Sequence, residues 1–570
     1  MTYRQLSPSY YRQRVPTTRW WGRLLYWALG PVGLIGIISL VVLVINFYFT
    51  YRVRPYDSDD VIMQNALLYW KPFDHITYFA DAGASYIDRI PLYWLVGRVI
   101  SPGRHALFVD GIILAVGNFA LFYWSTIYLL KKAGLRLTYL TLLPILWLSS
   151  FGYVVAELFV ATSMHNVEVG VILATCALIT KIYYGEFHPL ASPKALFLTI
   201  LCALVLGCTV VGDRYVVYYG LLPILVYAAV GFLYKQRSVI RKRIGILSGV
   251  IVLAFVFAAI IQLILAKSGV DFMSGVGART PQFVTYNLFF TNVEGTIYNL
   301  FIVFGADFWG GNVVSVATIG AILNGVLLFL TLRAAILYFR PATIERSKTD
   351  RGMPIQLMAI LFLWCIFILT ISSLGGNGTY HYFVLLPFVG VLLLINFLAT
   401  THGAKLRLAA ILLLVATVLN FGVNYYNAMV PSSISSNVFS GLDQANGRDN
   451  DIAHILEAHG LTDDAKGYSN YWQANITSYL SGGKLDILPV LCSDSGQTVV
   501  YKWLMTSSQL TRPVAKTFFL FDTSYQDAPN CPTSDVNTQY GAPAQVFNAD
   551  GTIVYVYNRN ITAPLQTGDV

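Results

Sequence analysis

The stretch WALGPVGLIGIISLVVLVINFYFT, residues 27–50, is followed at residues 56–60 by YDSDD. The first stretch carries no charge and is long enough to cross a bilayer, and basic residues precede it. Its apolar run is longer than the core of a signal peptide and lacks a small-residue cleavage site, so we expect an uncleaved span with a cytoplasmic N-terminus. The second stretch then places three carboxylates within four residues at the far membrane face. There they cost solvation free energy unless water, a cation or a partner charge meets them.

The composition of the whole chain agrees with this reading. The sequence is 56% hydrophobic and 12% charged, and its mean hydropathy is +0.59. Because soluble domains are roughly a quarter charged, the chain is predicted to be an integral membrane protein. The net charge of +9 needs no nucleic-acid partner, because Lys and Arg cluster at alternate span boundaries, as cytoplasmic loops require. Examples are the clusters at 4–23, 131–136 and 235–243.

Apolar periodicity predicts about eleven transmembrane helices, an odd number that puts the two termini on opposite sides. After the first, they are expected near 106–130, 137–156, 167–185, 195–211, 215–234, 244–266, 312–338, 355–373, 382–399 and 406–426. Two long outward loops interrupt them, at about 51–105 and 267–311. Interfacial helices are expected in the first loop at Val61–Trp70 and Pro91–Ile100, and the second loop is aromatic.

From about residue 431 the composition becomes polar, and acidic residues outnumber basic ones. Residues 431–570 are therefore predicted to form a soluble extracytoplasmic α/β domain, and residues 1–430 the transmembrane domain. Its expected helices are Asp451–His459 and Tyr471–Leu480, and its expected strands are Leu485–Leu491, Thr517–Phe521 and Thr552–Tyr557.

Four of the six cysteines lie inside apolar runs and are expected to be buried. Cys492 and Cys531 lie in the polar region instead. If that region is outside the cytoplasm, these two are expected to form a disulfide.

Several short motifs gather at the outward side of the predicted spans. Asp57-Ser58-Asp59-Asp60-Val61 opens the first loop and leads into an Asn-Ala-Leu-Leu helix, and Phe304-Gly305-Ala306-Asp307 closes the second. Residues 380–387 read YHYFVLLP, and the C-terminal region contains YWQA at 471–474 and SGG at 481–483. Combined with the span layout, these motifs resemble the GT-C superfamily of polytopic membrane glycosyltransferases. It includes protein O-mannosyltransferases, aminoarabinose transferases that act on lipid A, and arabinofuranosyltransferases. The likeness covers most of the chain. It depends on the combination of the motifs with the span layout, because each motif is short and weak by itself.

This resemblance implies an inverting transfer of a sugar from a polyprenyl-phosphate donor to an extracytoplasmic glycolipid, polysaccharide or protein, with a first-loop aspartate as general base. The family acid matches either Asp57 or Asp59. Asp59 is favoured because it leads the acidic pair directly before the interfacial helix. In an extended stretch Asp57 and Asp59 face one way and Asp60 the other. Asp60 then either contacts substrate or only caps the helix Val61–Trp70.

No cofactor is required by the pattern, although Asp57 and Asp59 could hold Mg²⁺ or Mn²⁺ through oxygen ligands.

Other outward charged residues are candidates for substrate binding. His165 and Glu168 begin the fourth span, where they would contact sugar hydroxyls, or where Asn166 and Glu168 simply favour a helix start. Asp213 and Arg214 occupy a tight turn. Either Arg214 reaches the donor phosphate or the two form a local ion pair.

Arg279 in the second loop could contact the donor phosphate or only lipid headgroups. His381 lies where many relatives carry an arginine. That departure leaves the cation for the leaving phosphate open, and a protonated His381 could serve. The pair Asp88-Arg89 in the first loop could orient the site, but a surface ion pair is the favoured expectation.

Two other functions remain possible on the sequence. A flippase or transporter of lipid-linked sugars would also have many spans, but such proteins often show inverted repeats, and none is evident. A scaffold that binds through its C-terminal domain would not need the acidic loop. The resemblance places the protein in a bacterial inner (plasma) membrane, among membrane lipids.

Overall fold

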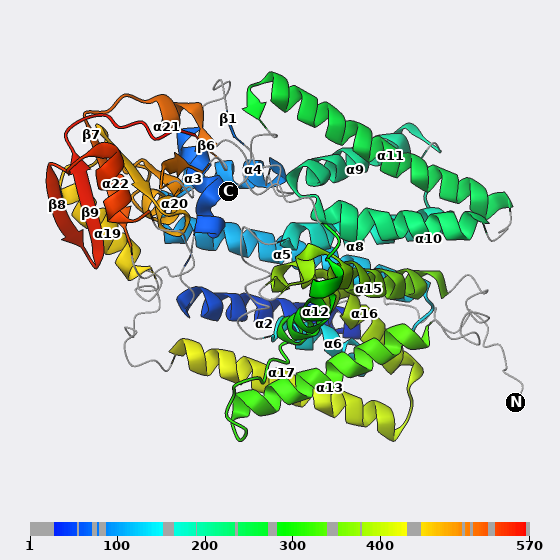
Figure 1. Ribbon diagram of the computed structural model, residues 1–570. Coiled ribbons are helices and arrows are strands. Elements are labelled where there is room, and N and C mark those ends of the chain that lie inside the picture. The colour runs from blue at the N-terminus through cyan, green and yellow to red at the C-terminus, as the bar shows by residue number, and fades with distance from the viewer. Residues whose placement is uncertain are drawn as a thin grey trace, which may run out of the picture.

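The computed structural model is a bundle of long helices with a small α/β domain at one end (Figure 1). It describes residues 28–53, 56, 58–70, 77–78, 87–151, 165–189, 191–233, 238–271, 282–338, 352–376, 379–429, 446–492, 496–501, 505–522 and 531–565.

Eight helices in these ranges are long and apolar enough to cross a membrane, so the chain is an integral membrane protein. They are α2 (Pro31–Val53), α5 (Arg104–Lys132), α9 (Pro193–Gly212), α11 (Ser238–Lys267), α13 (Val316–Leu337), α15 (Met353–Ile371), α16 (Leu385–Thr400) and α17 (Ala404–Met429). Helices also lie at the other three expected spans: α6 (Tyr139–Ser149), α8 (Asn166–Tyr183), and η3 (Val216–Leu221) with α10 (Leu222–Leu233). The count of eleven spans stays a prediction.

Helix α16 forms the centre of the bundle. Every residue from 385 to 395 is buried, which fits a helix that is apolar all round. It packs against α15, α6, α13 and α5. Around this centre α9 lies along α11, and α5 lies along α8.

Buried amides join the helices near the end of α6. Trp147 Nε1 donates to Asn324 Oδ1 at 2.9 Å, and Asn324 Nδ2 donates to Asn420 Oδ1 at 3.0 Å. Asn46 and Asn424 donate to the carbonyls of Ser149 and Phe151, at and just beyond the end of the helix. Carbonyls at a helix end lack an intrahelical partner, so these bonds fix where α6 stops.

The C-terminal domain is built on a six-stranded sheet in the order β5-β4-β3-β7-β9-β8. Strands β4, β3 and β7 run parallel, and the outer strands pair antiparallel. The strands are β3 (Ala465–Ser469), β4 (Ile487–Cys492), β5 (Thr498–Val500), β7 (Lys516–Phe521), β8 (Gln545–Ala549) and β9 (Thr552–Tyr557). The helices are α19 (Gly447–Ala458), α20 (Tyr471–Leu480), α21 (Ser507–Thr511) and α22 (Thr533–Tyr540). Cys492 and Cys531 form a disulfide, the pairing expected from the sequence.

A second, smaller sheet joins three distant parts of the chain. Strand β1 (Thr77–Tyr78) of the first loop pairs with β2 (Val270–Asp271) on one side. On its other side it pairs with β6 (Met505–Thr506) of the C-terminal domain. The first long loop, the start of the second and the C-terminal domain therefore meet at one place, near β1 and β6 in Figure 1.

The elements of the two outward loops lie close to where the sequence predicts them. The first loop contains α3 (Ser58–Tyr69), η2 (Ile87–Arg89) and α4 (Ile90–Val99). The second contains η4 (Tyr286–Leu288) and α12 (Phe289–Val303), and two short 3₁₀ turns, η6 (Ser373–Gly375) and η7 (Tyr380–Phe383), lie between α15 and α16. One expectation is wrong: α3 begins at Ser58, so Asp60 lies in its first turn and is not its N-cap.

Candidate functional site

The acidic start of the first loop forms the first turn of α3. Asp60 is completely buried there. Asp59 belongs to the same turn, but its side chain lies outside the described part of the chain, as do Asp57 and Arg279. The candidate base therefore stays a prediction, placed on a helix whose surroundings are well defined.

The C-terminal domain holds the beginning of this loop through one asparagine. The Asn446 side chain accepts from the Tyr56 backbone N–H at 2.9 Å and donates to the Tyr56 carbonyl at 2.8 Å. Arg104, at the start of α5, also donates to Asn446, and its guanidinium lies over the rings of Tyr51 and Tyr56.

Along its length α3 is covered by α20. Asn65 donates to Asn475 at 3.1 Å, and the Tyr69 hydroxyl donates to the Leu485 carbonyl at 3.0 Å. Tyr56 and Val61 share an apolar cluster with Ile476 of α20. The acidic turn is thus enclosed by the membrane helices and by the soluble domain together.

A second group of charged residues lies buried where η2 meets α8. Arg89 Nη2 donates to both carboxylate oxygens of Glu168, each at 3.1 Å. Both side chains are at least 99% buried. The sequence suggested that Asp88 and Arg89 form an ion pair on the surface. The structure contradicts this, because Arg89 is buried and pairs with Glu168. Arg89 reaches out of the first loop to a membrane helix. A bidentate pair of this kind fixes orientation as well as charge.

A histidine–aspartate pair lies beside it. His165 Nδ1 is hydrogen-bonded to Asp213 Oδ2, and Asp213 Oδ1 accepts from the Tyr215 backbone N–H at 2.8 Å. The His165 ring stacks on Tyr215, with centroids 4.5 Å apart. His165 occupies the N-cap position of α8 but makes no side-chain capping bond, and Glu168 lies in the first turn of that helix.

Two rings of η7, directly before α16, lie beside His165. Tyr382 and His381 lie with their ring centroids 5.1 and 5.8 Å from that of His165. The Tyr215 hydroxyl donates to the Tyr382 carbonyl at 3.1 Å. His381 is thereby brought next to His165 although the two are far apart in the sequence.

Asp88 is buried against Gly212, the last residue of α9. Among the described residues, neither of its carboxylate oxygens has a hydrogen-bond partner, and Oδ1 lies 2.3 Å from where a Cβ on Gly212 would stand. Burial, reinforced by the charge of Glu168, raises the pKa of Asp88 to about 8. Burial also raises the pKa of Asp213 to about 7 and lowers that of His165 to about 4.

The structure thus gathers four predicted residues, His165, Glu168, Asp213 and His381, into one region. Arg214 lies next to Asp213 in the chain and is partly exposed. Asp88 and Arg89 were noted in the sequence, but the burial of Arg89 against Glu168 was not predicted. Their signal was an acid–base pair directly before Ile90-Pro91, which begins α4.

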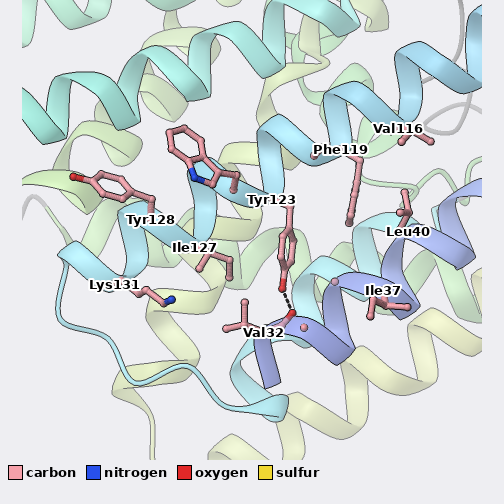
Figure 2. Close-up of a pocket in the computed structure, with 13 residues that line it drawn as sticks. Val32, Ile37, Leu40, Val116, Phe119, Tyr123, Ile127, Tyr128 and Lys131 are labelled. Atoms are coloured by element: carbon pink, nitrogen blue, oxygen red, sulfur yellow. Dashed lines mark hydrogen bonds between the residues drawn. The ribbon is translucent and has the colours of Figure 1, made fainter. Parts of the chain in front are cut away.

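Outside this region, the described part of the chain lines two further cavities. An apolar groove of about 510 Å³ runs between α2 and α5, and Figure 2 shows the Tyr123 hydroxyl donating to the Val32 carbonyl across it. No candidate residue lines this groove. A cleft of about 340 Å³ lies where residues 282–292 of the second loop meet Ser373 and Gly376. Exposed aromatic residues of the second loop lie at and near it, namely Phe283, Tyr286 and Phe290.

Comparison with known proteins gives structural matches alone. No family model matches the chain, and no curated protein matches it in sequence. The structure of ArnT from Cupriavidus metallidurans in the apo state matches with 11% identity and a TM-score of 0.49, covering 94% of this chain and 98% of that one. ArnT bound to undecaprenyl phosphate matches with 13% identity and a TM-score of 0.42, covering 94% and 99%. The archaeal oligosaccharyltransferase AglB from Archaeoglobus fulgidus, in complex with an inhibitory peptide and a dolichol-phosphate, matches with 12% identity and a TM-score of 0.43, covering 88% and 70%.

These matches extend over most of the chain, but with TM-scores below 0.5 they carry no argument about its superfamily or its activity.

Proposed function

We propose that the protein is a membrane glycosyltransferase that moves a sugar from a polyprenyl-phosphate donor to an extracytoplasmic glycolipid, polysaccharide or protein. The proposal includes inversion at the sugar, with Asp59 as general base and Asp57 as the alternative. It also places the protein in a bacterial inner membrane, with the N-terminus cytoplasmic. The C-terminal domain would then be extracytoplasmic, which suits the Cys492–Cys531 disulfide because disulfides persist in oxidising compartments.

The observation that carries the proposal is the sheet β2-β1-β6. It joins the first outward loop, the start of the second and the C-terminal domain. A reaction between a lipid-held donor and a water-exposed acceptor needs elements from both environments at one place. A flippase needs a path through the membrane and has no need of this arrangement.

The chemistry follows from what surrounds α3. A carboxylate in its first turn would take the proton of the acceptor hydroxyl, since a general base must lie within hydrogen-bond reach of that proton. The cover of α20 over α3 limits access of water, which would otherwise compete as acceptor. Arg214 and Arg279 are the proposed cations for the leaving phosphate, whose developing charge a fixed cation stabilises. His381 is a further proposed contact and would add charge only if it is protonated.

The test compares glycolipids and surface polysaccharides by mass spectrometry. Cells would have the gene deleted, restored, or restored as Asp59→Asn. We expect loss of one defined sugar on deletion and in the Asp59→Asn cells, because the amide cannot accept the proton. Asp451→Asn, at an exposed position on α19, is the matched control and should restore the sugar fully.

Two other outcomes would decide between the alternatives. Full transfer by Asp59→Asn together with loss in Asp57→Asn moves the base to Asp57. Build-up of unmodified lipid-linked sugar on the cytoplasmic side after deletion, with both aspartate variants active, would indicate a flippase.

A further inference from the structure

The apolar groove between α2 and α5 changes in character toward the end of α5. Most of its lining is glycine, aliphatic side chains and Phe119. Near the end of α5 the lining becomes Trp124, Tyr128 and Lys131, and none of the described residues that line the groove is acidic. Figure 2 shows Lys131 at this end, away from Val116 at the other. The groove is therefore apolar along its length and basic at one end.

Three lysines gather at that end, and we call them the basic cluster: Lys131, Lys132 and Lys181. The Lys181 ammonium, which comes from α8, lies 5.1 Å from the ring centroids of both Trp124 and Tyr128. Lys132 lies over the Tyr128 ring and forms an ion pair with Glu186. Three ammonium groups thus meet one carboxylate, and this excess of positive charge favours an anionic ligand.

The apolar part of the groove is open to the surroundings of the bundle. It exists because α2 contributes Gly33 and Gly36 to it, which have no side chains to fill the space. Ile37 and Trp124, which also line it, are 46% and 49% exposed. Both belong to helices long and apolar enough to cross a membrane. Lipid chains therefore have direct access to the groove.

The basic cluster lies far from the acidic start of α3. Helix α5 begins at Arg104, which donates to Asn446 beside the C-terminal domain, and the cluster lies at its other end. With 29 residues the helix is roughly 43 Å long, enough to cross a bilayer. The lipid donor proposed above would place its phosphate near α3, so the groove is a different lipid site.

The length of the groove fits one leaflet of a bilayer. On α5 it extends from Val116 to Lys131, and these fifteen residue steps cover roughly 22 Å. One leaflet contributes about 15 Å of hydrocarbon, so the rest of the groove reaches headgroup level. Trp124 and Tyr128 lie toward that level, where such rings are common in membrane proteins.

We propose that this groove binds one anionic glycerophospholipid of the adjacent leaflet. One acyl chain lies between α2 and α5, and the phosphate contacts the basic cluster. Basic pockets between spans are typical sites for anionic lipid headgroups. Because the lipid contacts α2, α5 and α8 together, it stabilises their packing. This inference does not depend on the reaction proposed above.

The experiment is native mass spectrometry of the delipidated full-length protein, titrated in detergent with phosphatidylglycerol or with phosphatidylcholine of the same acyl chains. We expect one retained phosphatidylglycerol per chain, bound roughly tenfold or more tightly than phosphatidylcholine because of the basic cluster. Thermal unfolding should move to higher temperature with phosphatidylglycerol, because a lipid that binds only the folded state stabilises it.

Two variants test the two parts of the site. Lys131→Gln removes one charge and should weaken phosphatidylglycerol binding roughly fivefold, the usual effect of one lysine beside an anionic lipid, without changing phosphatidylcholine binding. Ala120→Phe adds a ring at an exposed position of the lining and should abolish retention of either lipid. The matched controls are Lys405→Gln on α17 and Ala259→Phe on α11, both exposed and outside the groove. Both should bind phosphatidylglycerol as the wild type does.

Three results would overturn the inference. The first is equal retention of phosphatidylglycerol and phosphatidylcholine by the wild type. The second is unchanged phosphatidylglycerol binding by folded Ala120→Phe, which would place the lipid elsewhere. The third is tighter binding of undecaprenyl phosphate than of phosphatidylglycerol, lost in Ala120→Phe, which would assign the groove to a polyprenyl phosphate. The transfer reaction is tested separately through Asp59, so either proposal can fail without the other.

Discussion

Gly212 shows how a single missing side chain makes room for the buried charges. An alanine Cβ at this position would lie 2.3 Å from Asp88 Oδ1 and 2.6 Å from Asp88 Cγ, well inside van der Waals contact. Both carboxylate oxygens of Asp88 are buried, so a Cβ at residue 212 would force this side chain to move. The glycine is thus required for space, not for backbone conformation.

We predict that Gly212→Ala lowers stability by about 1–3 kcal/mol, the usual cost of overpacking. Gly249→Ala in α11 is the control, because a Cβ there meets nothing within 4 Å and alanine favours a helix by about 0.5–1 kcal/mol. Thermal unfolding of the two purified variants should therefore shift in opposite directions. Equal shifts would show that the space beside Asp88 is not restricted.

At the residue scale, the sequence indicated the acids but not their partners. His165, Glu168 and Asp213 stand out because ionisable residues are rare inside predicted spans, and those at the outward edges are not explained by the clusters of Lys and Arg on the other side. Asp88-Arg89 looks like an ordinary surface pair, since nothing local reveals that α8 and the turn after α9 will close around it. Burial of that kind is decided by packing between distant segments.

At the scale of elements, the first loop is shaped by a partner nearly four hundred residues away. Asn446 bonds both backbone groups of Tyr56 and receives a bond from Arg104. It therefore fixes the residue that precedes the acidic turn.

Removing this side chain leaves buried polar groups unsatisfied, each at a cost of about 1–3 kcal/mol. We predict that Asn446→Ala exposes the first loop to limited proteolysis and lowers glycosyl transfer, while the C-terminal sheet stays folded. Asn560→Ala, at an exposed position, is the control. An unchanged digestion pattern for Asn446→Ala would show that other contacts hold the loop.

Elements with regular patterns were predictable, and irregular ones were not. Helix α20 and strand β9 have the bounds expected from the sequence, helped by the N-cap Asn470 and by clear alternation. Strand β3 was missed because all five of its residues are buried, Lys466 included. The Lys466 ammonium donates to the carbonyls of Leu510 and Arg512. No local sequence pattern predicts these two hydrogen bonds.

At the scale of the whole molecule, the C-terminal domain is cross-linked by a disulfide and also packs against the first loop through α20 and α3. The Cys492–Cys531 disulfide spans 39 residues and crosses from β4 to the start of the α22 segment. We predict that Cys492→Ser with Cys531→Ser lowers stability by about 2–5 kcal/mol.

The measurement is thermal unfolding of the full chain, with thiol labelling of denatured protein before and after reduction. Two additional thiols should react after reduction. Cys202→Ser, at an exposed thiol of α9, is the control and should leave the unfolding temperature unchanged. Identical thermal unfolding curves for the wild type, the double cysteine variant and Cys202→Ser would mean that the disulfide adds no stability to the C-terminal domain.

The pairing of Asn65 with Asn475 also has a consequence for biosynthesis. The two residues are 410 positions apart, and translation proceeds at about 5–20 residues per second, so α3 waits roughly 20–80 s for α20 to be made. During that interval the acidic turn stands at the membrane surface without its cover. The last part of the chain to be synthesised therefore completes the surroundings of one of the first, and a chain released early would keep its spans but leave that turn open.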